Sequence, residues 1–246
     1  MKMASKVGKC KLCQRDGVTL QKSHFLPAGI YKILREDGEK NPNAVLLTGS
    51  KPVQTSWQMT AHLLCQDCEQ SLSKNGETWV LKHCLRKEGF SLASILASRV
   101  PDVSSEGTPT RLYYASRIPE IDASALAYFA ASMFWRASIH PWKDDGTIPV
   151  ELGPFREQFR LYLMGQGFFP TDCSLWLAIR EGKEIDRLTY APIGSRVGNF
   201  HVYRFPMPGL AFSLIVSKNI PDAHREKCFV HGPGNPIFVN PISTNY

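Results

Sequence analysis

The chain has 246 residues and a net charge of +7, and 43% of its residues are hydrophobic while 21% are charged. These values are typical of an ordinary soluble globular protein with one large domain or two modest ones. They exclude a membrane-spanning helix, because the longest apolar run, from Ala123 to Phe134, is shorter than the roughly 18 residues that a span needs. No apolar stretch follows the basic first residues, so we expect no secretory signal peptide.

Two cysteine pairs share one spacing. Cys10-Lys-Leu-Cys13 and Cys65-Gln-Asp-Cys68 each fit the bite that tetrahedral Zn²⁺ accepts from one knuckle of backbone, and two knuckles complete a closed Cys₄ site. A site without an open coordination position is structural. We therefore predict that Cys10, Cys13, Cys65 and Cys68 hold a structural Zn²⁺ that fixes the fold of residues 1–100.

The other three cysteines, Cys84, Cys173 and Cys228, are predicted to be thiols. Seven cysteines is an odd number, and four of them are better explained as metal ligands than as disulfide partners. This usage indicates a reducing compartment, so we expect a cytoplasmic protein with no membrane partner.

Around the cysteine pairs, the sequence predicts a strand, a helix, a loop and a second helix. A short strand ends near His24, and Ala28 to Arg35 forms a helix with one apolar face. Residues 36–58 are rich in Gly, Asn, Pro, Ser and Thr, which indicates a long loop. A helix from Glu69 to Leu85 follows, interrupted at Asn75-Gly76.

The second part of the chain begins with a loop-rich connector over residues 101–119. Ile121 to Ile139 is predicted to be a buried helix, because it is apolar nearly all round. Leu152 to Met164 is predicted to be an amphipathic helix that opens with Pro154 in its first turn. Short β-rich runs separated by Pro and Gly then predict four strands, at Leu175–Ile179, Phe200–Phe205, Leu210–Val216 and Ile237–Val239.

These elements predict an α+β fold in two parts. Residues 1–100 form the zinc module, and residues 101–246 form a helical pair that leads into a small, mostly antiparallel β region. Arg136 lies inside the predicted buried helix, and a buried guanidinium needs a partner. We expect an internal ion pair with Glu151 or Glu157, which would clamp the two helices together.

The positive charge is concentrated in the first part of the chain. Residues 1–100 contain 15 Lys and Arg against 8 Asp and Glu, whereas the remaining residues contain 14 of each kind. A basic zinc module joined to a neutral body indicates a polyanionic partner, nucleic acid first. A solvated lysine surface that aids solubility is an equally good explanation of the charge alone.

The order of elements around the cysteines resembles the HNH endonuclease family. The matching residues are Cys10 and Cys13, Ser23-His24-Phe-Leu-Pro27, and Leu63-Leu64-Cys65-Gln-Asp-Cys68-Glu69. The resemblance covers roughly the first 80 residues, and the order of the elements is more specific than any one of them. It implies a treble-clef module, in which a knuckle, a hairpin, a second knuckle and a helix follow one another.

This resemblance also implies catalytic residues. By position, His24 corresponds to the general base that activates water for attack on a phosphodiester, a task that suits an imidazole. Glu69 corresponds to a ligand of a catalytic Mg²⁺ or Mn²⁺, which would stabilise charge on the phosphate and the departing oxygen. The chain departs from the family pattern at three places. Ser23 stands where the family usually has Asp or His, and Glu69 where it usually has His. Thr60-Ala-His62 stands a few residues before Cys65, where the family has the Asn that orients the histidine.

A second resemblance extends over the whole chain. Ser-His-x-x-Pro, Leu-Leu-Cys-x-x-Cys-Glu, Phe134-Trp-Arg-Ala-Ser138 and Leu152-Gly-Pro154 are similar to motifs of a group of bacterial HNH-like proteins without an assigned role. This similarity implies that the zinc module and the later helices belong to one kind of protein. It concerns the fold more than the reaction.

We therefore expect an HNH-like, metal-dependent endonuclease that hydrolyses phosphodiester bonds in DNA, in defence against foreign nucleic acid. Two alternatives remain open: a non-catalytic nucleic-acid-binding module on a degenerate HNH scaffold, and a partner-binding protein whose β-rich C-terminal part supplies the contact surface. His24 and Glu69 also have plain structural interpretations, as a histidine bonded to backbone beside the metal and as an acid at a helix N-terminus.

Overall fold

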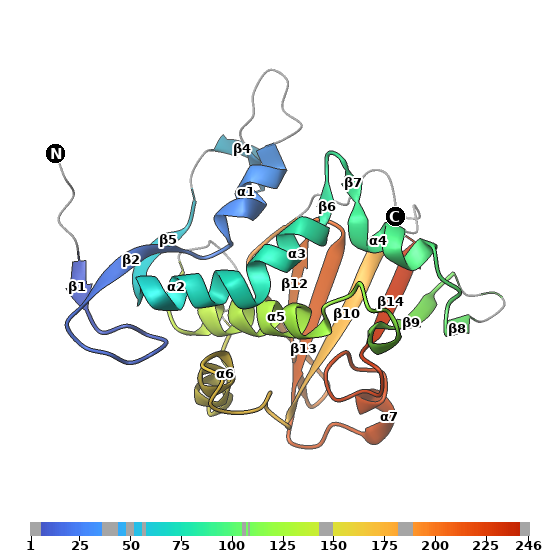
Figure 1. The fold of residues 1–246 in the computed structure, drawn as a ribbon. Coiled ribbons are helices and arrows are strands. Elements are labelled where there is room, and N and C mark those ends of the chain that lie inside the picture. Colours follow the sequence, from blue (N-terminus) through green and yellow to red (C-terminus); the bar gives the residue numbers. More distant parts are fainter. Residues whose placement is uncertain are drawn as a thin grey trace.

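The protein is a mixed α+β structure in which helices pack against sheets (Figure 1), so the predicted fold class is confirmed at this level. The structure is a computed structural model. It describes residues 6–35, 44–47, 52–55, 58–104, 107, 109–142, 150–181 and 189–241.

The N-terminal part is built on a three-stranded antiparallel sheet in the order β1-β2-β5. These strands are β1 (Lys6–Gly8), β2 (Val18–His24) and β5 (Thr60–Cys65). The predicted helix is α1 (Ala28–Arg35), whose Ile30, Tyr31 and Ile33 are buried. Within the predicted loop, β3 (Ala44–Leu47) pairs with β4 (Pro52–Thr55), and the other residues from 36 to 57 lie outside the described ranges.

The helix that leaves β5 is continuous where an interruption was predicted. It runs through α2 (Gln66–Leu72), the π-helical turn η1 (Ser73–Glu77) and α3 (Thr78–His83). The Thr78 amide donates to the Ser73 carbonyl, five residues back, so the turn accommodates one extra residue without breaking. A Cβ on Gly76 would lie 2.9 Å from the Phe129 backbone nitrogen, so this glycine permits a close helix contact.

Beyond this helix, a short hairpin and a helix complete the first hundred residues. The elements are β6 (Leu85–Arg86), β7 (Gly89–Phe90) and α4 (Ser91–Ala97). The central helix α5 (Ala123–Ser138) is buried nearly throughout, as its sequence predicts, and the Asp122 carboxylate caps it by accepting from the Ala125 amide at 2.8 Å. Helix α6 (Phe155–Leu163) starts directly after Pro154 and packs against α5.

A seven-stranded sheet forms the other half of the described structure, in the order β11-β12-β13-β10-β14-β9-β8. Only β10 and β14 pair in parallel. The strands are β8 (Val103–Ser104), β9 (Arg111–Tyr114), β10 (Cys173–Glu181), β11 (Ile193–Val197), β12 (Phe200–Met207), β13 (Leu210–Val216) and β14 (Pro236–Pro241). Two short helices are also present: η2 (Ala115–Arg117) directly follows β9, and α7 (Asp222–Arg225) lies between β13 and β14 in the chain.

The sheet is larger than the sequence indicates. The four predicted strands lie within β10, β12, β13 and β14, whereas β8, β9 and β11 were not predicted. Strands β8 and β9 are only two and four residues long and belong to the segment predicted as a connector. They join the sheet because β9 pairs with β14, which comes more than a hundred residues later. A pairing that distant leaves no local periodicity to detect.

Helix α5 lies between the helix formed by α2, η1 and α3 and the large sheet (Figure 1). On one side, the Phe129 ring centroid is 6.2 Å from that of Phe205 and 5.8 Å from that of Phe212, both on the sheet. On the other side, the Phe129 backbone meets Gly76 of η1. One cluster of buried residues joins both parts of the chain, from Cys10 to Val239. The division at residue 100 therefore stays a prediction.

In the described part of the chain, no helix is long and apolar enough to cross a bilayer.

The contact between Gly76 and α5 gives a direct test of this packing. Gly76→Ala should lower the free energy of unfolding by about 1–3 kcal/mol, because the new methyl group must displace the Phe129 backbone. Gly167→Ala is the control, since its Cβ would have no neighbour nearer than the Leu161 Cβ at 3.4 Å, an ordinary van der Waals contact. That change should stay within about 0.5 kcal/mol in urea denaturation. Equal effects of the two substitutions would contradict the packing described.

Candidate metal centre

The four cysteines of the two spaced pairs come together. Their sulfur atoms lie within 4.8 Å of one another, and the Cys13 and Cys65 sulfurs are 3.8 Å apart. Among the residues that the structure describes, this is the only group of three or more His, Cys, Asp or Glu side chains placed to hold a metal ion. Four sulfur donors at this separation fit a tetrahedral ion such as zinc.

Strand pairing brings the two cysteine segments together. Leu20 of β2 pairs with Cys65 of β5, and the Lys11 amide donates to the Leu63 carbonyl at 2.9 Å. The first segment is a tight turn between β1 and β2, closed by the Gln14 amide donating to the Cys10 carbonyl at 3.0 Å. In the second, Cys65 ends β5 and directly precedes α2, so Cys68 lies in the first helical turn.

The sulfur atoms already interact with one another and with the backbone. The Cys68 thiol hydrogen bonds to Cys10, which lowers the pKa of Cys10 to about 4 and raises the pKa of Cys68. The Cys65 amide also donates to the Cys10 sulfur at 3.4 Å. Metal ions bind thiolates, so the lowered pKa of Cys10 suits a metal ligand, whereas Cys68 would have to lose its proton when an ion binds.

Arg15 is a neighbour of the cluster that the sequence did not point to. Its guanidinium donates to the Cys13 sulfur at 3.4 Å and to the Cys65 sulfur at 3.5 Å. It also forms an ion pair with Asp67 at 2.5 Å. The hydrogen bond to Cys13, followed by those to Asp67 and Cys65, raises the pKa of Arg15. Hydrogen bonds from a neighbouring side chain to the sulfurs orient them, as contacts around metal ligands commonly do.

His24 is the last residue of β2 and is partly exposed. It pairs with Thr60 of β5, beyond an irregularity between Leu20 and Lys22 where the register shifts by one residue. Such bulges re-aim side chains and are frequent beside functional sites. His62, near the same irregularity, bonds through Nδ1 to the Leu20 carbonyl oxygen at 3.1 Å.

A buried ion pair holds the backbone at His24. Arg136 of α5 has a side chain that is 2% exposed, and its Nη1 donates to the His24 carbonyl oxygen at 3.2 Å and to the Phe25 carbonyl oxygen at 3.4 Å. Its Nη2 donates to the Glu77 carboxylate at 2.7 Å. The end of β2 is therefore fixed to α5 and to the helix that leaves the second cysteine pair.

This pairing corrects the partner expected for Arg136, which was Glu151 or Glu157. Glu157 bonds instead to Arg160, and that hydrogen bond lowers the pKa of Glu157. The π-helical turn explains why Glu77 was missed. Eight residues in an ideal α-helix turn about 80° past two full turns, and one extra residue in a wide turn cancels most of that rotation. Glu69 and Glu77 thereby lie near the same side of the helix.

Glu69 lies in the first turn of α2, the helix that contacts β2. Its Oε1 is buried without a hydrogen-bond partner among the described residues, and the same holds for the Ser23 hydroxyl next to His24. Buried polar atoms in folded proteins nearly always have partners, so an unpaired carboxylate oxygen indicates a place for an absent ligand or water. The catalytic roles of His24 and Glu69 stay predictions.

A basic cleft opens beside the first cysteine pair. It encloses about 290 Å³, and its lining includes Lys11, Arg156 and Arg160 against the single acid Glu157. Arg160 also donates to the Leu12 carbonyl oxygen at 2.7 Å, which ties α6 to the turn between Cys10 and Cys13.

Comparisons with known proteins are negative: no protein-family model, curated protein or solved structure matches this chain. The resemblance to HNH endonucleases therefore rests on the motifs alone.

The metal centre predicts a defined stoichiometry. Carefully purified protein should contain about one zinc per chain by elemental analysis. Cys65→Ser should abolish zinc binding and unfold the N-terminal part, because the metal supplies much of its folding free energy. Cys173→Ser, at a cysteine that is also buried but lies on β10, should keep the zinc. Full zinc content in the Cys65 variant would contradict the assignment.

The buried Arg136–Glu77 pair predicts that replacing Glu77 lowers stability much more than replacing Glu157. Glu77→Ala should destabilise the protein by about 3–5 kcal/mol, because it leaves the buried Arg136 charge without its counter-ion. Glu157→Ala breaks the more exposed pair with Arg160, in which Glu157 is 63% exposed, and should cost about 0–1 kcal/mol. Chemical denaturation of both variants measures the difference. Similar losses in the two would show that the buried pair has no special role.

Proposed function

We propose that residues 1–100 contain a treble-clef zinc module and that the protein is an HNH-like, metal-dependent endonuclease acting on DNA. The zinc would be structural, because Cys10, Cys13, Cys65 and Cys68 fill all four positions of a tetrahedral ion. The arrangement of a cysteine turn, the β2–β5 hairpin, a second cysteine turn and helix α2 supports this proposal.

The observation that carries the proposal is the buried, unpaired Oε1 of Glu69 on the helix that contacts β2. A carboxylate oxygen is a suitable ligand for Mg²⁺ or Mn²⁺, and such an ion, when bound, stabilises charge on the phosphate and on the departing oxygen. One protein carboxylate suffices, because Mg²⁺ usually keeps several waters and binds substrate phosphates.

His24 would act as the general base. Its imidazole would accept a proton from the attacking water. The hydrogen bond from Arg136 to the His24 carbonyl oxygen would keep the His24 ring in place relative to α2. Because Glu77 holds Arg136 and shares a helix with Glu69, the two proposed catalytic residues have a common support. Arg136 and Glu77 are positioning residues in this account.

The DNA backbone would dock on the basic cleft beside the first cysteine pair. Lys11 and Arg156 supply the net positive charge, since Arg160 is paired with Glu157 and fixed by its bond to the Leu12 carbonyl oxygen. Contacts of this kind give affinity that does not depend on sequence and that falls steeply with salt. Defence against foreign nucleic acid is the biological setting that the resemblance suggests.

A non-catalytic nucleic-acid-binding module is the second candidate. It is favoured by the composition of the site: in the described part of the chain, no group of three ligand side chains other than the four cysteines could hold a metal ion. Ser23, in place of a family ligand, further weakens any catalytic metal site. The basic cleft would serve such a module equally well.

A plasmid assay separates these candidates. Purified protein is incubated with supercoiled plasmid and Mg²⁺ or Mn²⁺, and His24→Ala should lower the cleavage rate by about 10²–10⁴-fold through loss of the base. His201→Ala, at an exposed histidine on β12, is the control and should cleave normally. Zinc content and circular dichroism must be unchanged in both variants.

Cleavage that survives in the His24 variant would contradict the catalytic assignment. Absence of cleavage with either metal, together with salt-sensitive DNA binding, would favour the binding module. Absence of binding even at low salt would leave the partner-binding alternative.

A further inference from the structure

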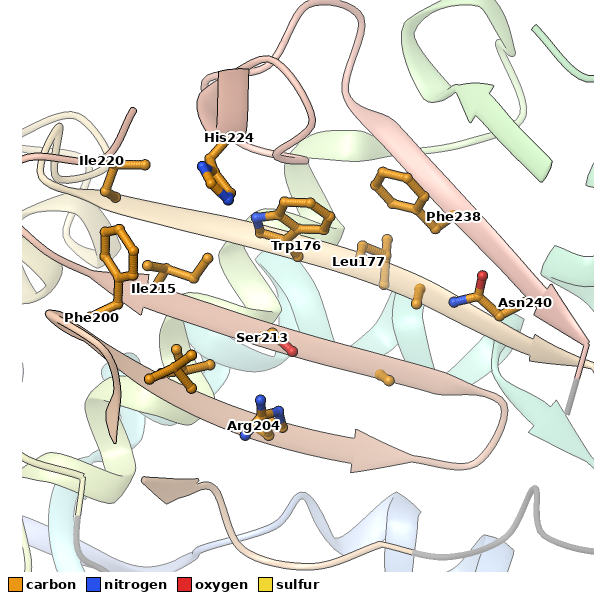
Figure 2. Close-up of a pocket in the computed structure, with 14 residues that line it drawn as sticks. Trp176, Leu177, Phe200, Arg204, Ser213, Ile215, Ile220, His224, Phe238 and Asn240 are labelled. Atoms are coloured by element: carbon orange, nitrogen blue, oxygen red, sulfur yellow. The ribbon is translucent and has the colours of Figure 1, made fainter. Parts of the chain in front are cut away.

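A groove lies on the face of the large sheet that points away from α5. It encloses about 460 Å³, and its floor is formed by β10, β12, β13 and β14 (Figure 2). A volume of this size falls within the range of about 300–1,000 Å³ that is typical of ligand sites. Nothing in the proposed nuclease chemistry uses this face.

Alternation along the strands explains why the groove is open. In β10, Leu175, Leu177 and Ile179 are fully buried on the α5 side, whereas Trp176 and Ala178 point to the other face and are partly exposed. The segment after β13 lies at one end of this face, where Ile220 and His224 line the groove and Val230 bridges to Leu175 at the edge of β10. The remainder of this face has no covering element in the described part of the chain.

Aromatic rings from three strands line the groove. Trp176 of β10 and Phe238 of β14 lie on neighbouring strands with ring centroids 5.2 Å apart and planes inclined by only 14°. Phe200 of β12 lies at the other end, where its ring centroid is 6.2 Å from that of His224 (Figure 2). The groove thus presents flat apolar rings at two separate positions.

The polar groups of the groove are basic or neutral. Arg204 lines it and donates to the Ser195 hydroxyl at 2.8 Å, and no acidic side chain is among its described lining residues. Arg180 follows Ala178 on the same side of β10. Neither arginine has an acidic partner in the described ranges. Ser213 and Asn240 add hydroxyl and amide groups, and the Asn240 Oδ1 accepts from the Thr110 hydroxyl at 2.9 Å.

We propose that this groove binds single-stranded nucleic acid. Unpaired bases would stack on Trp176, Phe238 and Phe200, while Arg204 and Arg180 would contact phosphates. Sheets that display aromatic side chains bind single strands in this way. The bases of a single strand can expose their flat faces to these rings, whereas the bases of a duplex are stacked on one another. The absence of acidic lining residues fits a polyanion and disfavours a basic partner.

This inference is independent of the proposed cleavage. The sheet and α5 separate the groove from His24, since Arg136 contacts His24 from α5 and Phe129 of the same helix packs on the inner face of the sheet. The groove would therefore anchor a strand rather than hold the bond that is cut. Binding here requires neither Mg²⁺ nor Mn²⁺.

The test is fluorescence anisotropy with a labelled oligothymidylate of about 12 nucleotides, without added Mg²⁺ or Mn²⁺. Phe238→Ala should weaken binding by about tenfold, within the range found when one stacking ring is removed. Arg204→Gln should also weaken binding and reduce the dependence of affinity on salt. Arg196→Gln is the matched control, because it removes the same charge from the opposite face of the sheet. A labelled duplex of the same length should bind less tightly, and the difference between single strand and duplex should narrow in Phe238→Ala.

Three results would overturn the proposal: no binding of the single strand at low salt, equal binding by wild type and Phe238→Ala, or equal losses in Arg204→Gln and Arg196→Gln. Sedimentation of the free protein tests the competing occupant, a second copy of the chain. A dimer that Phe238→Ala dissociates would also overturn the proposal. The plasmid assay distinguishes the failure of this proposal from the failure of the nuclease proposal. If the protein cleaves plasmid but Phe238→Ala binds the single strand as tightly as wild type does, only the groove proposal is contradicted. If Phe238→Ala weakens strand binding but no cleavage is found, only the nuclease proposal is contradicted.

Discussion

The contact among four cysteine sulfurs is the constraint on which the N-terminal half depends. Cys10 and Cys13 lie in a turn before β2, and Cys65 and Cys68 lie where β5 passes into α2. The intervening chain carries His24, so the same contact determines where β2 ends relative to α2. A bound ion would take the place of the remaining thiol protons and form four metal–sulfur bonds, and it would convert a small irregular fold into a rigid support.

The second constraint is electrostatic and connects this support to the rest of the protein. Arg136 is buried in α5 and neutralised by Glu77, and it also donates hydrogen bonds to the carbonyl oxygens of His24 and Phe25. A buried pair of this kind contributes little net stability compared with an apolar contact of the same size, but it fixes geometry and direction. Its position at the end of β2 is consistent with a role in orienting His24.

Features with a local cause could be predicted from the sequence. The cysteine spacing predicted which four cysteines come together, and the uniform apolarity of α5 predicted a buried helix within two residues at its N-terminus. Features with distant causes could not. The Glu77 partner of Arg136 depends on a π-helical turn that no sequence period signals, and β9 is a strand only because β14 pairs with it. The open groove could not be predicted either, because the groove side of β10 mixes Trp176 and Ala178 with Arg180, and this pattern alone cannot tell a covered face from an exposed one.

The central claim is that one zinc ion binds all four cysteines, and X-ray absorption at the zinc edge of the purified protein tests it most directly. The account predicts a single shell of four sulfur atoms at about 2.3 Å. A shell that contains nitrogen or oxygen at about 2.0–2.1 Å, or fewer than four sulfurs, would contradict the closed site and the support that it gives to His24 and Glu69.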